Sequence, residues 1–313
     1  MRNGPDYIQF YPTLRCNQSC DFCFNRSMPF VPDMSLQDCR AMFDRLNAVG
    51  ARTIDIIGGE PTLHPHLIDI VLTASQRGLR INISSNGTNT AVLEELLGSD
   101  GDINIGISIN DRKTLERLAG LVQKNRVVVK SVFCPSMDEA FVRDILALRP
   151  KKFYLIYRDA LDRKDLRETI PFHQFISFAE GQFNLSQTDT VSCSGFIPDN
   201  ENYPDLARVR CPAGTTKLGI MPDGAAYPCN LFFGKKEFLL GNILTDRFES
   251  IWNHPALAFF RAAAENSCPE TTCGLHARCH GGCPAHGFAH TGDLSAPDPR
   301  CSMKKISLRK STN

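Results

Sequence analysis

Short β-branched runs alternate with helical segments through the first half of this 313-residue chain, and this alternation limits its possible folds most strongly. The predicted strands cover residues 7–11, 53–57, 80–84, 103–109, 127–133 and 153–157. The clearest helix between them begins at its predicted N-cap, Ser35, and ends at Gly50. Strands that alternate with helices form a parallel sheet, and right-handed crossovers curl it. We therefore predict an α/β fold, a partial (β/α)6 barrel, with the working side chains at the carboxyl ends of its strands.

The sequence changes character after the sixth predicted strand. Residues 160–210 are polar, contain scattered prolines and show no sustained period, so we interpret them as a connection. Residues 211–313 are rich in cysteine and have few strong helix or strand signals, which is typical of loops folded around metal. The predicted organisation is a barrel at 1–160, a connecting segment at 161–210 and a loop-rich C-terminal domain at 211–313.

The charge balance and the apolar runs exclude several classes of protein. Lysine and arginine number 35 against 34 aspartates and glutamates, so the chain has no electrostatic footprint for nucleic acid or an anionic membrane. No apolar run approaches the roughly 20 residues that a membrane span needs. The first residues, MRNGPDYIQF, contain no apolar signal-peptide core, so we expect a cytoplasmic protein.

Cysteine is the unusual component of the composition. The chain has 13 cysteines, and they are densest between Cys193 and Cys301. In a reducing compartment such clustering indicates metal ligands rather than disulfides. An oxidised, secreted protein is the alternative, and the missing signal segment counts against it.

Three cysteines follow the first predicted strand, in the run Cys16-Asn-Gln-Ser-Cys20-Asp-Phe-Cys23. Three thiolates at this spacing can hold three irons of a [4Fe–4S] cube and leave the fourth iron without a protein ligand. An open iron is what a cluster needs in order to bind a substrate or a cofactor. Zinc is the alternative, but a zinc site requires four ligands, or three and a water, usually from C-x2-C pairs.

This C-x3-C-x2-C motif resembles that of the radical S-adenosylmethionine (SAM) superfamily, and later segments extend the resemblance. Gly58-Gly59-Glu60-Pro61 follows the second predicted strand, as the family's GGE motif does. The resemblance implies that Gly58 and Gly59 let the backbone approach the methionine part of SAM, and that Glu60 holds its ammonium group. The other residues that the resemblance implies in SAM binding are Ser84, Ser85, Asn86 and Ser108.

The resemblance also implies the chemistry. SAM chelates the open iron, the reduced cluster donates one electron to the sulfonium, and the resulting 5′-deoxyadenosyl radical abstracts a hydrogen atom from the substrate. Such an enzyme is expected to need a low-potential electron donor, a flavodoxin or a ferredoxin.

The C-terminal cysteines resemble the SPASM extension of radical SAM enzymes. Cys211 and Cys229 form a C-x12-G-x4-C pattern, and a second block of four cysteines runs from Cys268 to Cys283 before Cys301. One departure is the first gap of the second block, which has four residues where the family usually has two. The resemblance implies two auxiliary [4Fe–4S] clusters, and therefore three [4Fe–4S] clusters in all.

The cluster ligands are carried over from the family pattern. The implied ligands of the inner cluster are Cys211, Cys229 and Cys283. The implied ligands of the outer cluster are Cys268, Cys273, Cys279 and Cys301. Cys193 is the nearby candidate for a fourth inner ligand; if it is free instead, the inner cluster is open to substrate. Zinc knuckles are the alternative for this region. His280 and His286 lie near cluster cysteines and are expected to tune or pack rather than ligate.

SPASM radical enzymes mostly modify peptides or proteins, although some process sugars, tetrapyrroles or other small molecules. We therefore predict a peptide or protein substrate, with a small-molecule oxidoreductase and a non-catalytic iron–sulfur carrier as alternatives. No peptide-recognition domain precedes the first predicted strand, so the barrel mouth or a separate protein is expected to recognise a peptide. Sulfatase maturases have an aspartate base where this chain has Asn230, and an amide cannot accept that proton.

Three residues are candidates for contact with the substrate. Tyr157 and Asp159 end the sixth predicted strand and are expected to point into the barrel cavity, with an exposed polar loop as the alternative. Cys134 follows the fifth strand, where it is either buried or a hydrogen-atom donor facing the cavity.

Overall fold

One curled sheet organises the molecule in the computed structural model, which describes residues 4–124, 127–182, 188–191, 193–201 and 204–301. In sheet order, its strands are β10 (Gly241–Asn242), β9 (Ala225–Tyr227), β8 (Lys217–Ile220), β1 (Tyr7–Phe10), β2 (Thr53–Ile56), β3 (Arg80–Ser85), β4 (Ile103–Ser108), β5 (Val127–Phe133), β6 (Lys152–Tyr157) and β7 (Thr188–Val191). Neighbouring strands from β8 to β7 are parallel, whereas β9 and β10 pair antiparallel. The predicted α/β fold with a parallel core is confirmed.

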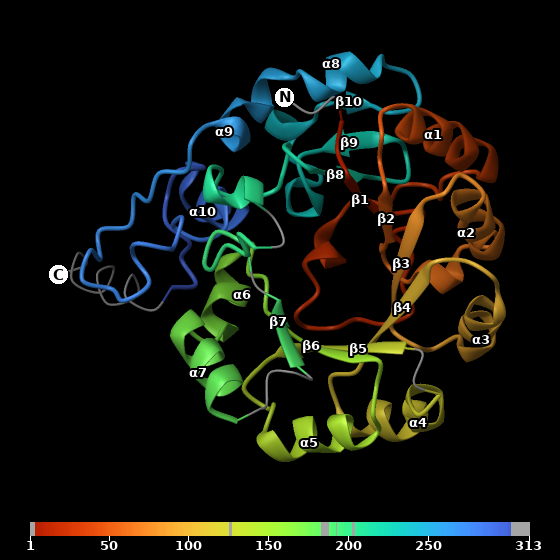
Figure 1. Cartoon of the computed structure of the whole chain (residues 1–313), viewed down its shortest axis with the longest axis horizontal. Helices are drawn as coiled ribbons and strands as arrows, with labels where there is room; N and C mark the ends of the chain where they lie inside the picture. Colours follow the sequence, from red (N-terminus) through yellow and green to blue (C-terminus); the bar gives the residue numbers. More distant parts are fainter. Residues whose placement is uncertain (1–3, 125–126, 183–187, 192, 202–203, 302–313) are drawn as a thin grey trace.

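Helices cover the outer face of the curl (Figure 1). Those that follow the strands of the first half are α1 (Leu36–Ala48), α2 (Leu67–Ser75), α3 (Thr90–Gly98), α4 (Arg112–Val122) and α5 (Glu139–Ala147). Those further along the chain are α6 (Arg163–Glu168), α7 (Phe172–Gln182), α8 (Phe248–Trp252), α9 (Ala258–Arg261) and α10 (Pro284–Thr291). Of the helices that the structure describes, none has the length and apolar character of a membrane span.

Helix α1 shows how the local sequence sets the ends of an element. The Ser35 hydroxyl accepts a hydrogen bond from the Asp38 amide at 3.1 Å, as the predicted N-cap requires. One face of the helix, which includes Cys39 and Phe43, is fully buried against the sheet. Gly50 follows the helix with a φ of +85°, a left-handed conformation that glycine adopts without strain.

Alternation along each strand separates a face that packs on helices from a face inside the curl. On β6, Phe153, Leu155 and Tyr157 are buried, while Lys152 and the other intervening residues are half-buried. The ring centroids of Tyr157 and Phe175 of α7 are 4.9 Å apart, so the buried residues of β6 face the outer helices. The polar residues at the intervening positions of the strands therefore line the interior.

The structure extends the sheet beyond the six predicted strands at both edges. The segment interpreted as a connection contains α6, α7 and β7, and β7 pairs in parallel with β6. At the other edge, β8 pairs in parallel with β1 although it lies in the predicted C-terminal domain. Strand β7 reads Thr-Asp-Thr-Val, so it lacks the apolar residues by which β1 and β2, of the same length, are predicted. The division at residues 160 and 211 stays a prediction.

Candidate functional site

The first cysteine loop, residues 16–23, lies directly after β1. Cys16 is exposed, while Cys20 and Cys23 are half-buried. Burial, and then the neighbouring cysteines, raise the pKa of the Cys20 thiol. Burial also raises the pKa of the Cys23 thiol, and Cys16 adds to that rise. The three thiols are therefore close enough to interact electrostatically, as ligands of one cluster must be.

Gly58 and Gly59 allow the turn after β2 to lie against the residues that precede the first cysteine loop. A Cβ atom on Gly59 would stand 2.1 Å from the Arg15 carbonyl oxygen, and one on Gly58 would stand 2.4 Å from that of Thr13. Two backbone hydrogen bonds join the segments, from the Gly59 amide to Thr13 and from the Glu60 amide to Arg15. The glycines thus position the first cysteine loop, and their predicted contact with SAM stays a prediction.

The Glu60 side chain connects the turns that follow β2 and β3. Only 1% of Glu60 is exposed. Its Oε1 accepts from the Thr62 amide and hydroxyl and from the Ser85 hydroxyl, the last at 2.8 Å. Its Oε2 accepts from the Asn86 amide at 2.6 Å. Because Oε2 has this one donor among the described residues, it retains capacity for the ammonium group that the sequence analysis assigns to it.

Asn86 and Ser85 lie differently although they are adjacent in sequence. Asn86 Nδ2 donates to Asn17 Oδ1 at 2.9 Å and lies 4.0 Å from the Cys16 sulfur, so it contacts the first cysteine loop. Ser85 is buried, and its hydroxyl accepts from the Gly87 amide while it donates to Glu60. Ser85 therefore holds the turn together, and its predicted contact with SAM stays a prediction.

Ser84 has a partner that the sequence analysis missed. Lys130 Nζ, from β5, donates to Ser84 Oγ at 2.7 Å. The lysine side chain crosses β4 at Gly106, where a Cβ atom would stand 2.5 Å from Lys130 Cε. The signal in the sequence is a lysine inside the apolar run VVVKSVF, at the strand position that faces the interior.

A mouth cavity of about 420 Å³ lies between the first cysteine loop and the end of β4. Cys20 and Phe22 line it from the loop, and Ser108 and Asn110 line it from β4 and the turn that follows. The structure therefore brings Ser108 beside the cysteine motif, at the carboxyl edge of the sheet.

Four cysteines from distant parts of the chain line an inner cysteine cavity of about 180 Å³. They are Cys193, Cys211, Cys229 and Cys283. Burial raises the pKa of Cys211 and of Cys229 to about 12 in each case. The pKa of Cys283 is raised well above its ordinary value, first by a hydrogen bond with Cys193 and then by burial. Lys217 of β8 also lines the cavity and opposes this rise at Cys211 and Cys229.

Four further cysteines of the C-terminal region form the implied outer set. Burial raises the pKa of Cys279, and Cys268 adds to that rise, so these two thiols are near each other. Cys279 Sγ also donates to the Gly195 carbonyl at 3.3 Å. Cys273 and Cys301 are half-buried. Over the described ranges, no three His, Cys, Asp or Glu side chains converge on a point suited to one metal ion.

The donor chemistry fits iron–sulfur clusters at two of these places. Thiolates are the ligands that such clusters take, with four for a closed site and three for one that keeps an open iron. The first cysteine loop supplies three thiols at an open edge, and the inner cysteine cavity supplies four around one space. Of the implied outer set, the structure brings Cys268 and Cys279 together.

Tyr157 and Asp159 both border the inner cysteine cavity, but their functional groups differ in availability. The Tyr157 hydroxyl lies 3.0 Å from the Ile170 carbonyl and 3.1 Å from that of Arg300, and burial raises its pKa. The expected projection of Tyr157 into the barrel is corrected, because its position on β6 directs the ring to α7. The Asp159 side chain is 30% exposed, and burial raises its pKa while Arg300 lowers it.

Cys134 follows β5 and is half-buried. Its sulfur lies 3.2 Å from the Ser136 hydroxyl oxygen, a local contact in the turn after the strand. Its predicted role as a hydrogen-atom donor stays a prediction.

Polar side chains join the two cysteine sites through the interior. Asn230, next to Cys229, donates from Nδ2 to the Tyr11 hydroxyl at 3.1 Å. Burial raises the pKa of Tyr11, and hydrogen bonds with Asn230 and with Asn25 oppose the rise. Asn25 lies two residues after Cys23 and Asn230 lies next to Cys229, so Tyr11 stands between the two cysteine sites.

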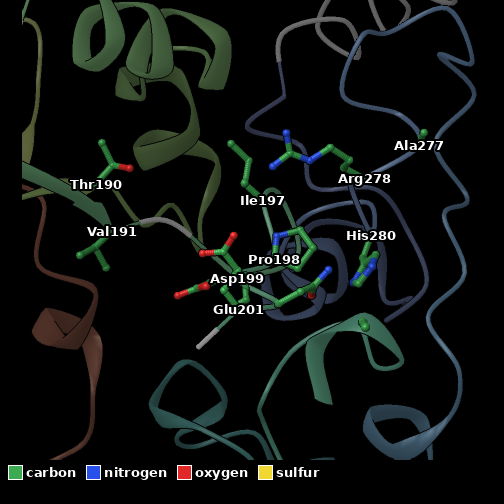
Figure 2. A pocket seen from close by; sticks show the side chains of 12 residues that line it. Thr190, Val191, Ile197, Pro198, Asp199, Glu201, Ala277, Arg278 and His280 are labelled. Atoms are coloured by element: carbon green, nitrogen blue, oxygen red, sulfur yellow. The ribbon is translucent and has the colours of Figure 1, made fainter. Parts of the chain in front are cut away.

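A third, larger space, the outer cavity, adjoins the inner cysteine cavity and has a volume of about 850 Å³. Val191 and Ser194 line both spaces. Figure 2 shows Asp199 and Glu201 in the middle of the outer cavity, with Val191 of β7 on one side and His280 on the other. Its lining comes largely from the segment read as a connection, which is why the sequence analysis did not predict it.

Comparisons with known families match two parts of the chain. The Radical SAM superfamily matches residues 10–131, and the SPASM iron–sulfur cluster-binding domain matches residues 211–283. The first match covers the first cysteine loop and the turns after β2, β3 and β4. The second covers all the inner cysteines except Cys193.

Relatives and solved structures align over most of the chain. The antilisterial bacteriocin subtilosin biosynthesis protein AlbA of Bacillus subtilis is 27% identical, over 91% of this chain and 68% of its own length. The AdoMet-dependent heme synthase of Methanosarcina barkeri is 21% identical, over 96% of this chain and 97% of its own length. Streptococcus suis SuiB, solved with S-adenosylmethionine, shares the fold, with a TM-score of 0.76 at 18% identity over 96% of this chain and 78% of SuiB.

Proposed function

This chain belongs to the radical SAM superfamily and carries a SPASM domain, and from that premise we propose that it is a peptide- or protein-modifying maturase. When bound, SAM and the cluster at the first cysteine loop supply the electron transfer and the carbon radical that takes a hydrogen atom from the substrate. The product of such a reaction is a crosslinked, epimerised or oxidised residue. The chain's own side chains bind the cofactors, orient the substrate and exclude water.

One observation carries the proposal: the two cysteine sites face one interior, bridged by the Asn25, Tyr11 and Asn230 side chains. A substrate held in this interior lies between the cluster at the first cysteine loop and a second redox group. Two buried oxygen atoms, Asn25 Oδ1 and Asp55 Oδ1, have no hydrogen-bond partner among the described residues. Amide N–H groups of a peptide are suitable donors for them.

The binding roles are assigned as follows. Cys16, Cys20 and Cys23 hold the cluster that binds SAM. Lys130 and Ser108 are proposed to contact SAM: the Lys130 ammonium suits an anion such as its carboxylate, and Ser108 lines the mouth cavity beside Cys20. The other proposed SAM-contacting residues are Gly58, Gly59, Glu60, Ser84 and Asn86.

Cys193 is proposed as the fourth ligand of the inner auxiliary cluster. It lines the inner cysteine cavity and makes a hydrogen bond with Cys283. Cys268, Cys273, Cys279 and Cys301 are proposed to hold the outer auxiliary cluster, which gives three [4Fe–4S] clusters. A flavodoxin or a ferredoxin is the proposed electron donor.

A peptide substrate agrees with the relatives and with the outer cavity. AlbA acts in bacteriocin biosynthesis, and SuiB has been solved with its precursor peptide SuiA. Strand β7 ends the sheet, and the Thr190 and Val191 side chains face the outer cavity (Figure 2). An extended peptide can pair with such a strand edge through its main chain. Its path along β7 leads to Ser194 and the inner cysteine cavity.

A small molecule is the second candidate, because the heme synthase of Methanosarcina barkeri aligns over 96% of this chain. The test uses the full chain, reconstituted and reduced without oxygen, with SAM. Short peptides encoded beside its gene and a tetrapyrrole are the two probes. We expect 5′-deoxyadenosine to form and the peptide to change mass, or to take up deuterium from deuterated water. Change of the tetrapyrrole alone would replace the proposal with the second candidate.

A further inference from the structure

Helix α10 begins at the inner cysteine cavity and carries two histidines toward the end of β6. Cys283 is its N-cap, and His286 and His290 follow one turn apart on the same face. Both histidines contact Ala160, the residue after Asp159: the Ala160 amide lies 2.9 Å from His286 Nε2, and the Ala160 carbonyl lies 2.8 Å from His290 Nε2. His286 is fully buried.

These contacts fix the proton on His286. The Ala160 amide donates to Nε2, so Nε2 carries a lone pair and the proton of the neutral ring is on Nδ1. Asp159 Oδ1 is the competing partner, but it lies 3.4 Å from Nε2 and the same distance from Arg300 Nη1. The shorter contact with the Ala160 amide therefore sets the tautomer.

The Nδ1–H group that results is buried and makes no hydrogen bond of ordinary geometry among the described residues. The ring lies near the Cys283 thiol, because His286 follows the N-cap Cys283 by three residues, about one turn of α10. A buried N–H group without an acceptor is unusual in a folded protein and indicates a missing partner. A thiolate at Cys283 would be an acceptor for it.

We propose that His286 Nδ1–H donates a hydrogen bond to the Cys283 thiolate when the inner cluster is bound, and that it raises the reduction potential of that cluster. The inference rests on the proposed function, since it requires a cluster in the inner cysteine cavity. Reduction adds negative charge that is spread over the cluster sulfurs, so an N–H donor stabilises the reduced form more than the oxidised form. His286 is thus a positioning residue, because it affects the reduction potential of the inner cluster through its hydrogen bond to Cys283.

Two substitutions separate the two ring nitrogens. His286→Gln places an oxygen where Nε2 stands, which keeps an acceptor for the Ala160 amide and removes the Nδ1 donor. His286→Asn places an NH₂ group where Nδ1 stands, which keeps the donor and removes the acceptor. His290→Gln is the matched control on the same helix face, because His290 contacts Ala160 and lines none of the cysteine sites described above.

The measurement is an anaerobic redox titration of the reconstituted full chain, followed by electron paramagnetic resonance. We expect His286→Gln to raise the oxidised-to-reduced ratio of the inner cluster about tenfold at a fixed potential, a shift of about 59 mV for a one-electron couple. His286→Asn and His290→Gln should leave the ratio within about threefold of the wild type.

An unchanged inner-cluster potential in His286→Gln would overturn the inference, as would an equal shift in His290→Gln. If His286→Asn does not fold, the comparison of His286→Gln with His290→Gln decides. Failure of the proposed cluster assignment is distinguishable, because the wild type would then contain no inner-cluster signal and correspondingly less iron. Failure of the peptide-substrate proposal would leave the inner-cluster potentials of the variants measurable.

Discussion

The first cysteine loop and the inner cysteine cavity are built in opposite ways from the same kind of ligand. The loop places three cysteines close together in sequence, between Cys16 and Cys23, at an open edge of the sheet. The cavity gathers four cysteines from separate segments between Cys193 and Cys283. The loop is thus a local feature that needs the fold only for its orientation, whereas the cavity exists only when β8, β9 and α10 are in place.

The two sites also differ in the burial of their thiols and in the thiol pKa values that follow from it. In the cavity, burial raises the pKa of Cys211 and of Cys229 to about 12. In the loop, Cys16 is exposed. Metal binding requires thiolates, so each cavity thiol must release a proton that it holds firmly. An exposed site suits a cluster that exchanges a cofactor, and a buried site suits one that stays bound.

Replacing all three cysteines of the first cysteine loop by alanine should have the largest effect on activity. We expect SAM cleavage to disappear completely, because the open iron is lost, while the auxiliary clusters remain. Iron should fall from about twelve to about eight atoms per chain. The measurements are 5′-deoxyadenosine by chromatography and iron by colorimetric analysis. Loss of nearly all the iron would show that the two sites do not form independently.

In the metal-free protein near pH 8, the cysteines of the inner cysteine cavity should be alkylated more slowly than those of the first cysteine loop. A thiol with a pKa of about 12 has a thiolate fraction roughly a thousandfold below that of an ordinary cysteine. The greater nucleophilicity of the more basic thiolate offsets part of this, so Cys211 and Cys229 should react roughly 50-fold more slowly. Their rates should rise with pH throughout the range below the pKa, because the thiolate fraction rises tenfold for each pH unit.

Peptide mapping of the alkylated protein measures these rates. Cys39, which is buried in α1 with a pKa raised by burial to about 12, is the control for a protected thiol outside any cluster. Cys16 should be labelled first. Labelling of Cys211 as fast as Cys16 would mean that the cavity is not formed without metal.

Thermal stability should show the smallest of the three differences. Cys229→Ala removes a proposed ligand that would join β9 to α10 and to the segments that carry Cys193 and Cys211, so the loaded protein should lose a few kcal/mol and roughly 5–10 °C in Tm. Cys23→Ala changes an edge loop and should lower Tm by at most roughly 2 °C. Scanning calorimetry of the reconstituted variants gives both values. Equal losses would remove the distinction between a local and a fold-dependent site.

The fold was largely predictable because its core strands are rich in apolar and β-branched residues and alternate with helical segments. All six predicted strands and the helix that begins after Ser35 are present. Strand β7 was missed because its residues, Thr-Asp-Thr-Val, are mostly polar, and β8 was missed as a sheet partner because its pairing with β1 joins residues far apart in the chain.

The parts of the site that depend on local motifs were predictable from the sequence. The parts that depend on the direction of side chains were not. Strict alternation along β6 already directs Tyr157 to the same side as Phe153 and Leu155, yet the sequence analysis placed it in the cavity. Alternation along β5 likewise directs Lys130 toward the interior, but the sequence analysis did not include this lysine among the site residues. The contacts of Glu60 with Ser85 and Asn86 depend on how two turns meet, which no spacing within either turn reveals.

Because β8 pairs with β1, the C-terminal third of this chain cannot be removed without disrupting the sheet of the barrel. Every residue of β1 has a parallel partner in β8 as well as in β2. A truncation before residue 217 would remove β8. The backbone amide and carbonyl groups along that edge of β1 could then pair with another chain. Engineers who graft a different auxiliary domain onto this barrel must therefore graft a strand with it.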